Sequence, residues 1–139
     1  MVLGPASLQA EWIKAETQDT LALGDPEYDG FYVYLSYFLT GEHRPYKMTS
    51  GVFDRVKPNR NFLDGGCGAL ELAGRYSHLD LDDGPIAGGE LDDYTLGLNW
   101  YWNPNTRVMF NYVRANVERE DLGLDEEADL VQLRLQFDF

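Results

Sequence analysis

The stretch "DLVQLRLQFDF", residues 129–139, alternates apolar and polar residues. Its apolar positions are Val131, Leu133, Leu135, Phe137 and Phe139, and polar residues stand between them. A period of two is typical of a β-strand that turns one face to an apolar environment. The stretch therefore predicts a strand held in a sheet, although the chain as a whole has a formal net charge of −13.

Five earlier stretches alternate in the same way. They are residues 7–13, 31–40, 70–77, 94–102 and 107–113. β-branched and aromatic residues dominate them, as strands prefer. The chain is 44% hydrophobic and 14% aromatic, which is too apolar for a disordered segment of 139 residues. These features predict one all-β domain over residues 1–139, with about six antiparallel strands.

Composition and missing motifs exclude several functional classes. The 24 acidic residues outnumber the 11 basic ones, so binding to a nucleic-acid backbone is not expected. Cys67 is the only cysteine, which excludes an internal disulfide and a cysteine-based zinc site. The sequence has neither a run long enough for a membrane helix nor a signal peptide. Catalytic motifs are also missing, and we expect no enzyme activity, no cofactor and no metal site.

Charge is sorted along the chain. Residues 16–29, 80–93 and 118–129 are rich in acids, whereas residues 43–60 hold five bases against Asp54 alone. We predict the acidic stretches to be long loops at one end of the sheet, and the basic segment to lie at the other end. Short turns at one end and long loops at the other are typical of outer-membrane barrels.

Alternation alone leaves two environments open. In an outer-membrane β-barrel the apolar face meets lipid and the polar face lines the lumen. In a soluble β-barrel or sandwich the apolar face would be the core and could bind a small apolar ligand. Aromatic residues near the strand ends favour lipid, because they are typical of interfacial girdles.

Two stretches resemble the phosphate-selective porin O and P family most specifically: "SYFLTGEHRPY" (36–46) and "LGLNWYWNPNTRVMFNYV" (96–113). The resemblance covers nearly the whole chain. It implies an antiparallel up-and-down transmembrane β-barrel in the outer membrane of a Gram-negative bacterium, with sixteen strands, of which this chain would supply the last six. It further implies a homotrimer that passes anions such as phosphate or polyphosphate by diffusion, in contact with outer-membrane lipid and lipopolysaccharide. A final strand that stops on Phe139 resembles the segment that the barrel-insertion machinery reads, and we expect a C-terminal fragment that does not function alone.

Basic residues are the candidates for the anion path. Those of the basic segment are Arg44, Lys47, Arg55, Lys57 and Arg60, and those of the predicted lumen face are Arg75, Arg107 and Arg134. Clustered positive charge attracts anions through its summed field. The alternatives are that residues of the segment hold the barrel floor or pair with lumen acids, and that the three lumen arginines pair with Glu71 or Asp138. Residues 80–84 superficially resemble a calcium loop, but the spacing of its ligands fails.

Overall fold

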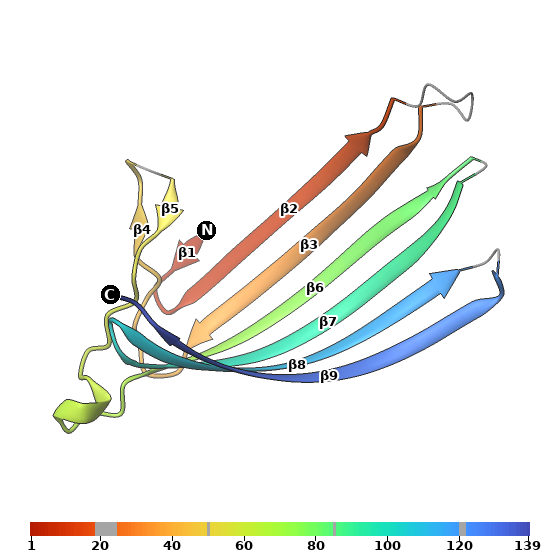
Figure 1. Cartoon of the computed structure of the whole chain (residues 1–139). Coiled ribbons are helices and arrows are strands. Elements are labelled where there is room, and N and C mark those ends of the chain that lie inside the picture. The colour runs from red at the N-terminus through yellow and green to blue at the C-terminus, as the bar shows by residue number, and fades with distance from the viewer. Residues whose placement is uncertain (19–24, 50, 85, 120–121) are drawn as a thin grey trace.

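The computed structural model describes residues 1–18, 25–49, 51–84, 86–119 and 122–139. Seven strands form one antiparallel sheet in the order β1-β2-β3-β6-β7-β8-β9 (Figure 1). Their bounds are β1 (Val2–Leu3), β2 (Ala6–Glu16), β3 (Glu27–Phe38), β6 (Ala69–Asp83), β7 (Ile86–Asn103), β8 (Thr106–Arg119) and β9 (Leu124–Phe137). All six predicted strands are present and neighbours in sequence pair in space, so the up-and-down all-β prediction is confirmed. The sheet is open, with β1 and β9 at its two edges.

No helix within the described ranges is long and apolar enough to cross a membrane.

The strands run farther than the alternation predicted. β6 continues to Asp83, β7 starts at Ile86, and β9 starts at Leu124, so most of the acidic stretches 80–93 and 118–129 are strand. Their prediction as long loops was wrong. Backbone pairing continues there although the apolar stripe of the outer face has ended. Residues 19–24 of the first acidic stretch, residue 85 and residues 120–121 lie outside the described residues.

The ends of the sheet differ in the way predicted from charge. The strands begin and end at two opposite ends of the sheet. We call the end that carries the β7–β8 turn and the C-terminus the near end, and the opposite end the far end (Figure 1). The connections β2–β3, β6–β7 and β8–β9 lie at the far end and belong to the acidic stretches. The basic connection, residues 39–68, lies at the near end and carries β4 (Tyr46–Lys47), β5 (Val52–Phe53) and a single 3-10 turn, η1 (Phe62–Asp64).

Strand register brings the apolar residues together on one face. Leu8 pairs with Leu35, Leu98 with Phe110, and Phe110 with Leu133, so large side chains form continuous rows across the sheet. The opposite face carries rows of polar and small residues, one of which is Ser7, Ser36, Ala73, Gly97, Asn111 and Gln132. The sequence therefore builds a two-faced sheet.

Burial is opposite to that of a soluble protein. Leu96, in the middle of a central strand, exposes 65% of its surface, and Leu133 exposes 76%. On the polar face Glu71 is fully buried, and Ser36 and Asn99 are buried beside it. Soluble domains rarely expose so large a contiguous apolar area. The apolar face is thus the outer surface of the sheet.

A row of aromatic side chains lies at the far-end limit of this apolar face. Tyr112, Tyr94, Tyr76, Phe31 and Trp12 stand on successive strands from β8 to β2. Their rings approach closely, with Tyr76 stacked on Tyr94 at 4.9 Å and edge-on to Phe31 at 5.7 Å. In the register, the row rises by four residues over four strand spacings. At ~3.4 Å per residue and ~4.8 Å per spacing, the row is inclined by about 35°, which is the strand tilt of membrane barrels.

The apolar band also has the height of a bilayer core. Along β7 it runs from Tyr94 to Trp102, which is nine residues and eight residue spacings. This is ~27 Å along the strand and ~22 Å after correction for the inclination. Outer-membrane barrels have an apolar band about 25 Å tall between two aromatic girdles.

Beyond this far-end aromatic row the two faces exchange character. The outer positions become acidic: Asp80 pairs with Glu90, and Glu90 with Glu118. The neighbouring inner positions become apolar, because Leu79 pairs with Leu91 and Leu91 with Val117. The alternation therefore serves the membrane-level part of the strands and is reversed outside it.

The entry into β6 depends on glycine. Gly68 has φ +72°, and a Cβ there would lie 2.3 Å from the Tyr101 carbonyl oxygen. We expect Gly68→Ala to lower the free energy of unfolding by ~1–3 kcal/mol, because it adds both backbone strain and a clash. Urea titration in the presence of lipid vesicles measures this. Gly84→Ala is the control, because Gly84 also has positive φ but no atom lies within 4 Å of its added Cβ. Equal losses in both variants would contradict the role of the clash.

Candidate functional site

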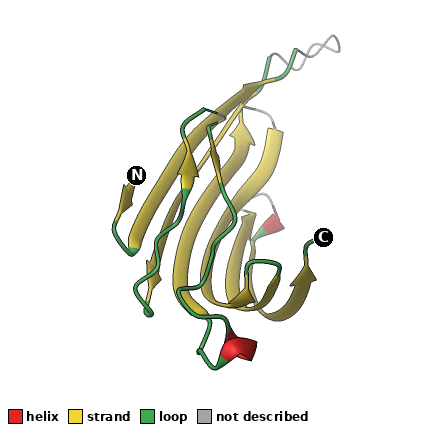
Figure 2. Ribbon diagram, turned by 90° about the vertical axis from the view of Figure 1, so that its left-hand side faces the viewer, coloured by secondary structure: helices red, strands yellow, loops and turns green. Residues whose placement is uncertain are grey.

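The near-end connection, residues 39–68, covers part of the polar face. Figure 2 shows the sheet curving around the connection. Val56 of the connection is buried in a small core with Phe38, Ala69 and Tyr101. Arg55 donates from Nη1 to Oδ1 of Asn105 in the β7–β8 turn at 2.6 Å. The connection is therefore packed against the sheet on the side that the polar rows occupy.

A buried carboxylate anchors the connection to the wall. Glu71 on β6 is completely buried, accepts three hydrogen bonds and forms an ion pair with Arg44. Its Oε1 accepts from Nε of Arg44 at 3.0 Å and lies 2.9 Å from Nη2 of Arg44. Its Oε2 receives Nδ2 of Asn99 at 3.0 Å and the hydroxyl of Tyr101 at 2.8 Å. A buried charge is stable only when it is paired and hydrogen-bonded, and Glu71 is both.

Arg44 is held on several sides. It also donates from Nη2 to the Tyr34 hydroxyl at 2.7 Å, and its guanidinium lies over the rings of Tyr34 and Phe53. Burial alone would lower the pKa of the Arg44 guanidinium, but its interactions with Glu71, Tyr34 and Tyr101 together outweigh burial, and the pKa lies above its usual value. Arg44 is therefore a permanent cation whose charge is matched by Glu71.

A second carboxylate holds the part of the connection that leads back toward β6. Glu42 is buried and accepts the backbone N–H of Asn59 at 3.0 Å and the hydroxyl of Thr40. The same Thr40 hydroxyl accepts the backbone N–H of Leu70 at 3.0 Å. Lys47 pairs with Asp54 across the β4–β5 hairpin at 3.1 Å. The backbone N–H of Arg55 and the Lys47 ammonium lower the pKa of the Asp54 carboxyl.

Three further arginines lie on the polar face, on three different strands. Arg75 on β6 stacks on the Tyr32 ring at 4.9 Å, and Arg107 on β8 donates twice to Oε1 of Gln136, at 3.1 and 2.8 Å. Arg134 on β9 is exposed. Among the residues that the structure describes, none of the three has a carboxylate partner.

Two hollows on the polar face are bordered by these cations. One, of about 490 Å³, extends over the sheet and is lined by Arg75, Arg107 and the guanidinium side of Arg44. The other, of about 440 Å³, lies at the near end between the connection and the β7–β8 turn, with Arg55 and Arg107 in its wall. Arg107 borders both, so the arginines line one continuous side of the sheet.

Comparison with known proteins decides the family. The profile of the family described as "Phosphate-selective porin O and P" matches residues 1–139. The chain belongs to this porin family. It is 33% identical to Porin O of Pseudomonas aeruginosa over 99% of its own length, and spans about a third (33%) of the length of that protein. It is also 40% identical to an uncharacterized protein of Caulobacter vibrioides over 63% of this chain and 17% of that protein.

Family membership identifies the polar face as the lumen side of a porin wall and the apolar face as its outer side. The eight predicted path residues divide on this wall into three groups. Arg44 and Lys47 are paired with acids, while Arg55, Arg75 and Arg107 bind neutral partners. Lys57, Arg60 and Arg134 are exposed and have no polar partner within the described part of the chain.

One predicted set of ion pairs is wrong. We expected Arg75, Arg107 and Arg134 to pair with Glu71 or Asp138. Glu71 is occupied by Arg44, and Asp138 accepts from Nε2 of Gln136 at 2.9 Å. The lumen guanidiniums of this porin wall therefore keep their charge uncompensated by these two acids.

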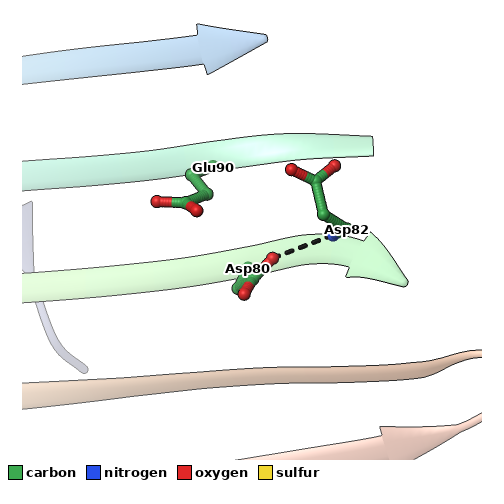
Figure 3. A group of neighbouring side chains, drawn as sticks. All are labelled: Asp80, Asp82 and Glu90. Atoms are coloured by element: carbon green, nitrogen blue, oxygen red, sulfur yellow. Dashed lines mark hydrogen bonds between the residues drawn. The ribbon is translucent and has the colours of Figure 1, made fainter. Parts of the chain in front are cut away.

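The acidic far end brings three carboxylates together. One oxygen each of Asp80, Asp82 and Glu90 lie within 4.8 Å of one another (Figure 3). The Asp82 backbone N–H donates to Asp80 Oδ1 at 2.9 Å, at a register shift between β6 and β7. Exposed acidic groups often gather in this way without an ion. We assign no function to this cluster.

Sequence reasoning missed how much of the site depends on Glu71. Its partners Asn99 and Tyr101 lie on the polar face of the next strand, and Arg44 lies 27 residues away in an irregular connection. The available signal was a carboxylate inside a strand, which is rare unless the group is paired. Its partner could be chosen only once the course of residues 39–68 was known.

Proposed function

We propose that the chain forms part of the wall of an outer-membrane porin whose lumen passes anions, such as phosphate or polyphosphate, by passive diffusion. The supporting observation is the set of uncompensated guanidiniums on the lumen side. Arg75, Arg107 and Arg134 stand on three strands and face the same hollow side of the sheet, without carboxylate partners in the described ranges. A positive lining of this kind concentrates anions and repels cations.

The basic connection adds to this path at the near end. Arg55 lines the near-end hollow together with Arg107. Arg44 and Lys47 lie along the same route, with their charge matched by Glu71 and Asp54. We propose that the path uses Arg55, Arg75, Arg107 and Arg134 for attraction, and that Arg44 and Lys47 position the connection.

The soluble alternative finds no support in the burial pattern. A soluble barrel or sandwich that binds an apolar ligand needs its leucines inside. Leu96 and Leu133 are instead among the most exposed side chains of the sheet, and Glu71 is among the most buried. Porin membership likewise implies a channel and not an enzyme, and we propose no catalytic step.

The partners of the whole channel are part of the proposal. Six long strands leave β9 with one unpaired edge, and a family barrel of sixteen strands would cover it. We propose that the chain contributes the C-terminal strands of such a barrel in the bacterial outer membrane and does not conduct alone. The proposal includes a homotrimer, contact with lipid and lipopolysaccharide, and recognition of the exposed Phe139 by the insertion machinery.

Neutralising the lumen arginines tests the path. We expect Arg75→Gln and Arg107→Gln each to lower the anion-over-cation permeability of the assembled channel by about twofold or more, because a unit charge ~8 Å from the ion contributes ~0.5 kcal/mol in water. Planar-bilayer reversal potentials in a salt gradient measure the ratio.

The control is Arg114→Gln, which removes the same charge from the outer face. Arg114 stands directly opposite Tyr94 in the register and pairs with Glu127. We expect it to leave the permeability ratio unchanged. A channel that prefers cations, or one whose ratio falls equally in all three variants, would contradict the proposal.

A further inference from the structure

The η1 turn lies on the outer side of the wall, although Arg44 and Val56 of the same connection lie on the lumen side. Phe62 packs edge-on against Trp100 at 4.8 Å and lies 5.6 Å from Trp102. Both tryptophans belong to the apolar face, because Trp100 pairs with Val108 and Leu70 in the outer rows. Figure 1 shows η1 well apart from the β4–β5 hairpin. The connection therefore passes from the lumen side to the outer side at the near-end rim.

The turn is a fixed structure. Its backbone closes through three hydrogen bonds, from Asp64 and Gly66 to the Asn61 carbonyl and from Gly68 to the Arg60 carbonyl. Trp100 Nε1 donates to the Cys67 carbonyl at 2.8 Å and ties the turn to β7. Gly66 lies so close to Arg60 that a Cβ there would be 2.4 Å from the Arg60 Cβ. The direction of the side chains on η1 is therefore set by the wall.

Those side chains are apolar and cationic. Leu63 exposes 75% of its surface and Phe62 exposes 39%. Arg60, at the start of the turn, and Lys57, just before it, are exposed, and neither side chain forms a hydrogen bond or ion pair among the described residues, although the charge of Lys57 helps to lower the pKa of the Asp54 carboxyl. The only acid of the turn, Asp64, accepts from Nδ2 of Asn61 at 2.8 Å. This small region carries a net positive charge in a chain whose formal net charge is −13.

We infer that residues 57–67 form a membrane-interface anchor for anionic phospholipid, outside the barrel wall at the near end. Phe62 and Leu63 insert at the boundary of the acyl chains, beside the aromatic pair Trp100 and Trp102. Arg60 and Lys57 bind the phosphate headgroups of the same leaflet. Apolar side chains flanked by cations are the combination that binds an anionic bilayer surface. This assigns Lys57 and Arg60 to lipid and leaves the ion path to the lumen arginines.

Lipid fits this surface better than a second protein subunit. The turn continues the apolar band at its near-end aromatic limit, where the neighbouring Trp100 and Trp102 already mark the interface. It offers one leucine and part of one phenylalanine, which is far less apolar surface than a stable protein interface needs. Two free cations complement phosphate groups, which are present in every orientation around a barrel.

A pair of cysteine variants tests the insertion. In the full chain with Cys67→Ser, one variant carries Leu63→Cys and the other Met48→Cys, and each is labelled with an environment-sensitive fluorophore. Met48 is the matched control, because it is an exposed apolar residue (89%) of the same connection, beside the β4–β5 hairpin. In phosphatidylcholine vesicles with spin-labelled acyl chains, we expect several-fold stronger quenching at position 63 than at position 48. Equal quenching at the two positions would overturn the inference.

The charge arm uses vesicles of equal parts phosphatidylcholine and phosphatidylglycerol. We expect the anionic lipid to strengthen quenching at position 63, and the double change Lys57→Gln and Arg60→Gln to abolish that gain. Lys47→Gln is the control, because Lys47 is bound to Asp54. A gain that persists in the double variant, or that Lys47→Gln also removes, would overturn the headgroup assignment. None of these readouts depends on the ion selectivity of the channel.

Discussion

Replacing Glu71 by alanine is expected to lower the free energy of unfolding by about 3–5 kcal/mol, because it breaks a buried ion pair. The change removes the acceptor of three hydrogen bonds and leaves the Arg44 guanidinium without its counter-charge. The neighbouring side chains are affected as well, because Asn99 and Tyr101 lose the acceptor to which they donate. Urea titration of the chain in lipid vesicles measures the loss.

The double variant Arg44→Met and Glu71→Leu separates the pair from its surroundings. Replacing both members of a buried ion pair by apolar residues is often neutral, so we expect it to recover most of the lost stability. We also expect trypsin to cleave after Lys47 and Arg55 much faster in Glu71→Ala than in the parent chain, because the connection loses its anchor. A double variant as unstable as the single one would show that Arg44 is not the partner that matters.

Replacing Leu96 by arginine is expected to reduce stability in a bilayer by about 2–4 kcal/mol, whereas the adjacent Thr95→Arg has little effect. Leu96 is at the middle of the apolar face, and Thr95 borders the lumen hollow. The comparison of the two variants shows whether lipid or water contacts the apolar face. Leu96 already exposes 65% of its surface, so in a water-soluble protein its replacement by arginine would change stability by no more than ~0.5 kcal/mol.

The measurement is again equilibrium unfolding in vesicles, with both arginine variants in the same lipid. If Thr95→Arg were the more damaging of the two, the assignment of the faces would be reversed. That outcome would also remove the basis for the lumen path, because Arg75 shares a register row with Thr95.

The membrane-level half of the fold was predictable from sequence, and the remainder was not. Where lipid meets one face, the physical demand is a strict period of two, and that pattern gave every long strand and its two faces. Beyond the aromatic row, toward the far end, the outer positions become acidic and the inner positions become apolar, as Leu79 and Asp80 show. The apolar stripe therefore does not predict the acidic extensions of the strands. Irregular residues 39–68 carry no periodicity, and neither their hairpin nor η1 was predicted.

The sequence pattern predicted which basic residues lie on the polar face, but not which residues they bind. The lumen arginines were found because alternation placed Arg75, Arg107 and Arg134 on the polar face. The prediction of their partners was wrong, because Glu71 binds Arg44 of the connection. Ion pairs that join a strand to a distant connection depend on tertiary geometry, and sequence spacing cannot supply it.

The 35° inclination of the aromatic row gives the radius of a closed barrel for each number of strands. At that slope a closed wall of six strands ~4.8 Å apart would have a radius of only about 6 Å, and side chains alone would fill it. The β4–β5 hairpin and Val56 already occupy the hollow of the sheet, so a ring that narrow has no room for them. Sixteen strands at the same slope give a radius of about 15 Å, which accommodates the hairpin and still leaves a water-filled passage beside it.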